Sequence, residues 1–140
     1  MARHSRGYFQ VVGDSMEPLL HSHYSTVVIE KPAGRLKKYD VALFHRPGGT
    51  FPNQPKGRYV LHRVVKVREG DYLICGDNRV YREPVPEQWI VGVMTGFFNG
   101  DAYTPCDDEE YRRYLDGLER RRVGVWFRLL PGRVKRKLFG

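Results

Sequence analysis

The sequence has only two cysteines, Cys75 and Cys106, and lacks any long apolar run. The cysteines show no CxxC spacing, so we expect free thiols in a reducing compartment rather than a disulfide framework or a zinc site. No window approaches the ~20 apolar residues of a membrane-spanning helix. The basic N-terminus is not followed by the apolar stretch of a signal peptide. These absences predict a cytoplasmic protein and give no reason to expect a metal or another cofactor.

Acidic residues are missing from the last part of the chain. Residues 1–119 hold sixteen Lys/Arg and sixteen Asp/Glu, whereas residues 120–140 hold eight Lys/Arg and no acid, so the net charge of +8 lies in the tail. Four apolar side chains recur there at every fourth position: Trp126, Leu130, Val134 and Leu138. This pattern is typical of an amphipathic helix at an anionic membrane surface.

The tail is open to three interpretations. One is peripheral contact with a membrane or a protein partner through residues 120–140, and another is a solvated tail whose aromatic half packs on the rest of the chain. Nucleic acid is disfavoured as a partner, because the remaining 119 residues carry no net positive charge and contain no recognisable helix-turn-helix.

Short β-prone runs separated by turns predict a mainly β fold. The predicted strands are 8–12, 25–31, 40–46, 59–68, 72–75 and 89–98. Residues 47–57 contain three prolines and three glycines and are predicted to form a loop. The strands at 59–68 and 72–75 are expected to pair as a hairpin, and Asn99-Gly100-Asp101 is expected to form a hairpin turn.

The character of the chain changes after Pro105. Asp107 and Glu110 have the spacing of a capping-box pair, and apolar side chains then follow at helical spacing. We therefore predict a helix near 107–122. The expected organisation is a β domain of residues 1–105 followed by a helical, basic extension of residues 106–140.

The segment VVGDSMEPLL, residues 11–20, places a serine directly after a predicted strand. Gly13 ends the strand, and Pro18 fixes its own φ near the start of a helical turn. Free backbone N–H groups beside a hydroxyl are what an oxyanion requires. A serine before a proline turn also commonly does no more than cap a helix. The pattern alone leaves both interpretations open.

Residues 13–20 nonetheless resemble the G-x-S-M-x-P-x-L box of type I signal peptidases and LexA-type self-cleaving proteins. The resemblance implies that Ser15 is a nucleophile and that Met16 and Pro18 belong to the substrate-binding segment. Many signal peptidases have Ser or Thr where this chain has Gly13. We therefore expect the oxyanion to be held by backbone N–H groups around Gly13 and Ser15, chiefly that of Ser15.

The segment LHRVV, residues 61–65, resembles the strand on which the same families carry their general base. His62 stands where most members have lysine, and this variant resembles the endoplasmic-reticulum type of signal peptidase. A histidine with a pKa near ~6.5 is mostly neutral at pH 7, so it needs no large pKa shift to accept a proton. Lys66, four residues further along the strand, is the alternative base.

Gly76-Asp77-Asn78 resembles the G-D-N box of signal peptidases. In histidine-type members a second acid six positions later is the usual partner of the histidine, and here that position is Glu83. Asp77 and Glu83 are both candidates for orienting His62. Residues 83–92 also resemble the V-P-E-x-x-I-V-G continuation of the family, so the likeness extends over about residues 8–98.

The resemblance implies a LexA/signal-peptidase-like core of twisted antiparallel sheets and a serine endopeptidase that removes a leader or signal-type peptide from a precursor. Its peptide or precursor-protein substrate is expected to bind as an added β-strand. Two alternatives stay open. One is a non-catalytic β binding module on the same fold. The other is a self-cleaving LexA-type regulator, which needs a cleavage site in cis and usually a DNA-binding domain, for which few residues precede Ser15.

Overall fold

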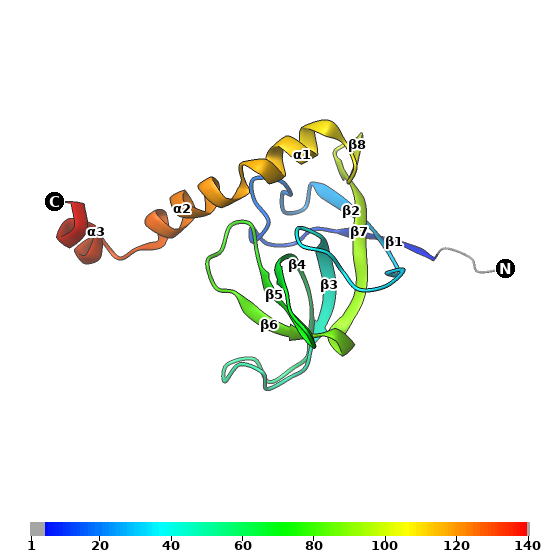
Figure 1. Cartoon of the computed structure of the whole chain (residues 1–140), viewed down its shortest axis with the longest axis horizontal. Helices are drawn as coiled ribbons and strands as arrows, with labels where there is room; N and C mark the ends of the chain where they lie inside the picture. Colours follow the sequence, from blue (N-terminus) through cyan, green and yellow to red (C-terminus); the bar gives the residue numbers. More distant parts are fainter. Residues whose placement is uncertain (1–4, 140) are drawn as a thin grey trace.

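The strands join edge to edge in one antiparallel sheet (Figure 1). The computed structural model describes residues 5–139, and within them the sheet has eight strands in the order β1-β2-β7-β3-β4-β5-β6, with β8 paired to β7. Their bounds are β1 Arg6–Gln10, β2 Ser25–Glu30, β3 Val41–Arg46, β4 Arg58–Val67, β5 Asp71–Cys75, β6 Glu83–Pro86, β7 Ile90–Asn99 and β8 Ala102–Pro105. The predicted mainly β fold is confirmed.

The central strands are buried on both faces, which explains their nearly continuous apolar sequences. In β3, Val41 and Leu43 belong to one core cluster, while Ala42 and Phe44 belong to the other. This division follows from the alternation of side chains along a strand. The first cluster also contains Met16, Val27, Ile29, Met94 and Phe97, and the second also contains Val60, Val64, Ile74 and Val85. β4 contributes to both clusters, since Leu61 packs against the first and Val60 and Val64 belong to the second.

The short strand β6 was not predicted, whereas β8 pairs with β7 across the hairpin turn that was expected at Asn99-Gly100-Asp101. β6 contains Pro84 and Pro86 and pairs only with β5 within residues 5–139. Proline disrupts a central strand but is tolerated at a sheet edge, so the sequence signal for β6 was masked by its prolines. The 47–57 loop and the β4–β5 hairpin are present as predicted.

The predicted helix at 107–122 is wrong in its bounds. Helix α1 spans Glu109–Asp116 and is capped by Asp108 rather than Asp107, since the Asp108 carboxylate accepts the Tyr111 backbone N–H. Gly117 then separates α1 from α2, which spans Leu118–Leu129. Helix α3, Gly132–Phe139, follows Pro131. The four-residue apolar repeat of the tail therefore continues across a break between two helices.

The C-terminal helices begin against the β body, which is the eight-stranded sheet with its loops, and end far from it (Figure 1). Tyr111 of α1 and Leu118 and Val125 of α2 are buried, so both helices pack on the body through one side. Figure 1 shows α3 as the most distant element. None of the helices within residues 5–139 has the length and apolar character needed to cross a membrane.

Candidate active site

Ser15 lies in a tight turn that follows an extended segment paired with the start of β2. The Val11 backbone N–H donates to the Ser25 carbonyl at 2.9 Å, and the His23 N–H donates to the Val11 carbonyl at 2.8 Å. Gly13 has a φ of +88°, a conformation that favours glycine, and here the chain leaves the extended path. Met16 is buried in the first core cluster, which anchors the turn next to Ser15.

The loop after β5, residues 76–79, holds in place the turn of residues 13–16, which we call the serine turn. The Asn78 backbone N–H donates to the Ser15 carbonyl at 2.9 Å, and its side-chain amide donates to the Asp14 carbonyl at 3.0 Å. The Arg79 guanidinium binds the Asp14 carboxylate at 2.7 Å. The G-D-N box therefore has a structural role that local sequence could not reveal: it fixes the backbone on both sides of the Ser15 nitrogen.

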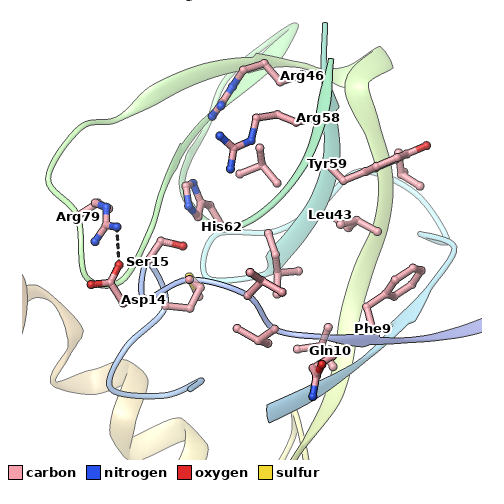
Figure 2. Close-up of a pocket in the computed structure, with 18 of the residues that line it drawn as sticks. Phe9, Gln10, Asp14, Ser15, Leu43, Arg46, Arg58, Tyr59, His62 and Arg79 are labelled. Atoms are coloured by element: carbon pink, nitrogen blue, oxygen red, sulfur yellow. Dashed lines mark hydrogen bonds and ion pairs between the residues drawn. The ribbon is translucent and has the colours of Figure 1, made fainter. Parts of the chain in front are cut away.

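Ser15 and His62 face the same cavity (Figure 2). The cavity has a volume of about 790 Å³ and is lined by the end of β1, the serine turn, parts of β3 and β4, and Arg79. A Cβ atom at Gly76 would lie 2.6 Å from the Ser15 carbonyl oxygen and 3.3 Å from the His62 Cδ2 atom. Gly76 therefore occupies the narrow space between the two residues, and the predicted pair is brought together.

His62 is half-buried on β4, opposite Ala42 of β3. Burial lowers the pKa of His62 to about 4, and the positive charges of Arg46, Arg79 and Arg58 lower it as well, whereas Asp77 raises it. The imidazole is therefore neutral at pH 7 and has a free lone pair. Within the described residues no hydrogen bond joins it to the Ser15 hydroxyl, and such bonds often tighten only when substrate binds.

Neither expected acid makes a hydrogen bond to His62. Asp77 binds the Arg63 guanidinium through both carboxylate oxygens, at 2.8 and 2.9 Å, and also accepts the Tyr114 hydroxyl. Glu83 binds Arg46 through both oxygens, at 2.8 and 2.6 Å. A charged, bidentate guanidinium is a stronger partner for a carboxylate than a neutral imidazole. Asp77 acts on His62 only through its charge.

The oxyanion site differs from expectation at Gly13. The Gly13 N–H donates to the Ser22 hydroxyl at 2.9 Å and is not available to a ligand. The Ser15 N–H, by contrast, donates to no acceptor within residues 5–139. A free N–H on the residue of the predicted nucleophile is one donor of the kind an oxyanion hole needs.

The remaining predicted residues, Met16, Pro18 and Lys66, do not lie together in one site. Met16 lines the inner side of the cavity but is only 2% exposed, and Pro18 lies in a separate hollow between the serine turn and α2. Lys66 is exposed and does not line the cavity. The structure therefore favours His62 over Lys66 as the base.

Three arginines of the site were not predicted. Arg46 ends β3, Arg58 begins β4, Arg79 follows the G-D-N box, and all three line the cavity. Only the position of Arg79 next to a family-like box offered a sequence signal. Both cysteines are free thiols; Cys75 is buried, and burial raises the pKa of each thiol, so neither resembles a nucleophile.

The cavity thus brings together a hydroxyl, a neutral imidazole and a free backbone N–H, which is the combination that acyl transfer requires. Among the described residues no three His, Cys, Asp or Glu side chains are grouped so as to hold a metal ion. Comparison with protein-family models, with curated proteins and with solved structures found no match for the chain.

Proposed function

We propose that this protein is a serine endopeptidase that uses Ser15 and His62. The observation that carries the proposal is the cavity that Ser15 and His62 both line, beside which a Cβ atom at Gly76 would meet both the Ser15 carbonyl oxygen and the His62 ring. The sequence boxes that resemble those of signal peptidases support the same assignment independently.

The proposed reaction is acyl transfer to Ser15 followed by hydrolysis. The Ser15 hydroxyl oxygen attacks the scissile carbonyl carbon while His62 accepts the hydroxyl proton, and His62 then gives that proton to the leaving amine. The Ser15 N–H donates to the oxyanion. Water then attacks the acyl carbon while His62 accepts a proton from it, and His62 gives that proton to the Ser15 oxygen as the acyl group leaves as a carboxylic acid. Asp77, whose charge raises the pKa of His62, favours the imidazolium that forms in each step.

An extended peptide fits the shape of this site. β1 is a terminal strand of the sheet and pairs only with β2 in the described part of the chain. Phe9, Gln10, Val11 and Val12 run along the cavity. A substrate strand that pairs with this edge would pass Ser15, which supports a leader or signal-type segment of a precursor as the substrate class.

Labelling with a fluorophosphonate probe tests the proposal directly. Wild-type protein and Thr50→Ala, which loses an exposed hydroxyl on the 47–57 loop, are expected to label equally. Ser15→Ala is expected to lose labelling, and His62→Gln to label at least about 100-fold more slowly. Equal labelling of Ser15→Ala and wild type would contradict catalysis at Ser15 and favour the non-catalytic binding module. Self-fragmentation of purified wild type, absent in Ser15→Ala, would favour the self-cleaving regulator.

We also propose that the C-terminal helices make peripheral contact with an anionic membrane surface. α2 exposes Val123, Trp126 and Leu129, with exposed fractions of 66%, 46% and 51%, although its opposite side is packed on the body. Residues 120–140 contain no acid. Exposed apolar side chains combined with charge of one sign complement an anionic lipid surface better than a typical mixed-charge protein surface.

Sedimentation with vesicles tests this contact. The protein is expected to bind phosphatidylglycerol/phosphatidylcholine vesicles and not phosphatidylcholine alone, with binding reduced by Trp126→Ala and by Arg133→Gln. Arg112→Gln removes a charge from α1 that is also exposed and is expected to bind like wild type. Equal binding to neutral vesicles, no binding to either, or preferential binding to added duplex DNA would contradict the proposal.

A further inference from the structure

The three arginines of the cavity differ in whether a carboxylate already holds them. Arg46 binds Glu83 in a nearly buried pair, and Arg79 binds Asp14 in an exposed pair. Arg58 lines the same cavity, and within residues 5–139 it has no hydrogen-bond or ion-pair partner. Asp14 is the one carboxylate among the lining residues, and it is already held by Arg79. The cavity therefore carries one positive charge that the described residues do not compensate.

Arg58 is placed to meet a ligand of the catalytic pair. It begins β4, whose pairing with β3 is regular from Arg58 to Arg63, so Arg58, Val60 and His62 share one face of the strand. Figure 2 shows its guanidinium on the cavity side, between Arg46 and His62. The charge of Arg58 is also felt at the reacting group, since it is one of the causes that lower the pKa of His62.

We propose that Arg58 is a specificity-determining residue that binds a glutamate or aspartate of the substrate, two to four residues from the scissile bond. Arg58 and His62 are four residues apart, roughly 13 Å along an extended strand. An extended substrate covers that span in about four residues, and the length of the arginine side chain shortens it. A guanidinium binds a carboxylate through two parallel hydrogen bonds, which a neutral glutamine cannot reproduce.

Binding of the acid has a second consequence at His62. Four charged side chains act on the imidazole: Arg46, Arg79 and Arg58 disfavour its protonation, and Asp77 favours it. A substrate carboxylate that neutralises Arg58 removes one unfavourable interaction, so His62 becomes a better proton acceptor when an acidic substrate occupies the cavity. A substrate with glutamine at that position leaves the imidazole as it is in the free protein.

Binding of an acidic peptide by Arg58 does not require cleavage, and only the position of the acid relative to the cleaved bond rests on the proposed peptidase function. Binding and cleavage are therefore tested separately. Fluorescein-labelled alanine-rich nonapeptides with one central glutamate, or glutamine in its place, are titrated into the Ser15→Ala protein and followed by fluorescence anisotropy. We expect the glutamate peptide to bind about three- to tenfold more tightly, with the advantage shrinking as salt is raised. Adding Arg58→Gln should abolish the advantage.

Lys56→Gln is the matched control. Lys56 lies two residues before Arg58, is exposed and does not line the cavity, so this variant loses the same charge without changing the site. It is expected to keep the full glutamate preference. A preference that is absent in the Ser15→Ala protein, that persists in Arg58→Gln, or that is lost equally in Lys56→Gln would overturn the proposal.

Cleavage by the wild-type protein then locates the acid. Mass spectrometry of the products of peptides with glutamate at successive positions is expected to place the cut two to four residues from the glutamate, and Arg58→Gln should remove that bias. Cleavage without any dependence on glutamate would overturn the role of Arg58 and leave the peptidase function standing. Arg58-dependent binding without cleavage of any peptide would overturn the peptidase function and leave an acidic-peptide site.

Discussion

Arg58 and Arg63 are the same residue type five positions apart on β4, yet the structure uses them in opposite ways. The Arg63 side chain is 0% exposed and binds the Asp77 carboxylate, the Tyr39 carbonyl and the Tyr111 hydroxyl. Arg58 is exposed on the other face of the strand. Because side chains alternate along a strand, one segment can present a structural arginine to the interior and a ligand-binding arginine to the cavity.

The interior network connects the region of the Ser15–His62 cavity to the C-terminal helices. Asp77 accepts hydrogen bonds from Arg63 of β4 and from Tyr114 of α1. Arg122 of α2 donates to the Gly76 and Arg79 carbonyls, at 2.9 and 2.8 Å. The loop at 76–79, which fixes the serine turn, is therefore held from behind by both helices. The helical extension supports the site in addition to offering an exposed surface.

Replacing a buried arginine should lower the free energy of unfolding far more than replacing an exposed one. Arg63→Met leaves the Asp77 carboxylate buried without its cation, so we expect the free energy of unfolding to fall by about 3–5 kcal/mol. Arg68→Met breaks the exposed pair with Asp71, and such a pair contributes little to stability. Urea denaturation of both variants measures the difference. Similar losses would mean that the interior network is not essential to stability.

The second effect is the pH dependence of stability that His62 produces. The pKa of His62 is about 4 in the folded protein and near ~6.5 in the unfolded chain. Between these values the unfolded chain binds a proton that the folded protein does not, so stability falls as pH drops from ~6.5 to about 4. The total loss is on the order of 3 kcal/mol. His62→Gln should flatten this part of the curve, and an unchanged slope would contradict the assignment.

The same pKa sets the acid limb expected for the proposed peptidase activity. The limb of kcat/KM reports the base of the free enzyme, so we expect its midpoint near 4 rather than near ~6.5 for an unperturbed histidine. Arg58→Gln removes one cause of the lowered pKa and should move the midpoint upward. Lys56→Gln, which is not among the principal causes of the shift, should move it less.

A third comparison is between two glycines. Gly76→Ala places a methyl group against the Ser15 carbonyl and the His62 ring, so we expect activity to fall about 100-fold through displacement of the serine turn. A Cβ at Gly70, in the β4–β5 turn, would meet no atom within 4 Å. Gly70→Ala should therefore keep wild-type activity. Peptide cleavage rates, with circular dichroism as a check on folding, measure both.

A smaller change in peptide binding is expected when Arg79 is released from its carboxylate partner. Asp14→Asn releases Arg79 from an exposed pair, which should change stability little. It also leaves a second uncompensated arginine in the cavity. Glutamate peptides should then bind more tightly to Asp14→Asn combined with Ser15→Ala than to Ser15→Ala alone. Unchanged or weaker binding would show that the charge of Arg79 does not reach the ligand.

Local patterns predicted the main strands but not the limits of the helices. The buried strands around β2, β3 and β4 were predictable because their apolar runs are set by burial on both faces. The break at Gly117 and the cap at Asp108 were not, since Asp107 and Asp108 are equivalent by local pattern until the packing of Tyr111 selects the start of α1. Prolines in β6 hid a strand whose edge position made them tolerable.

Neighbouring residues alone are enough to predict that a serine follows a strand, that a histidine lies on a later strand and that the tail is basic. The partner of each carboxylate depends on contacts between distant segments, so it is visible only in the folded chain. Asp77 and Glu83 were both candidate partners of the His62 imidazole. In the structure Arg63 binds Asp77 and Arg46 binds Glu83, each through a charged, bidentate guanidinium. Arg58 is therefore the arginine of the cavity that no carboxylate of residues 5–139 binds, so it remains available to a ligand.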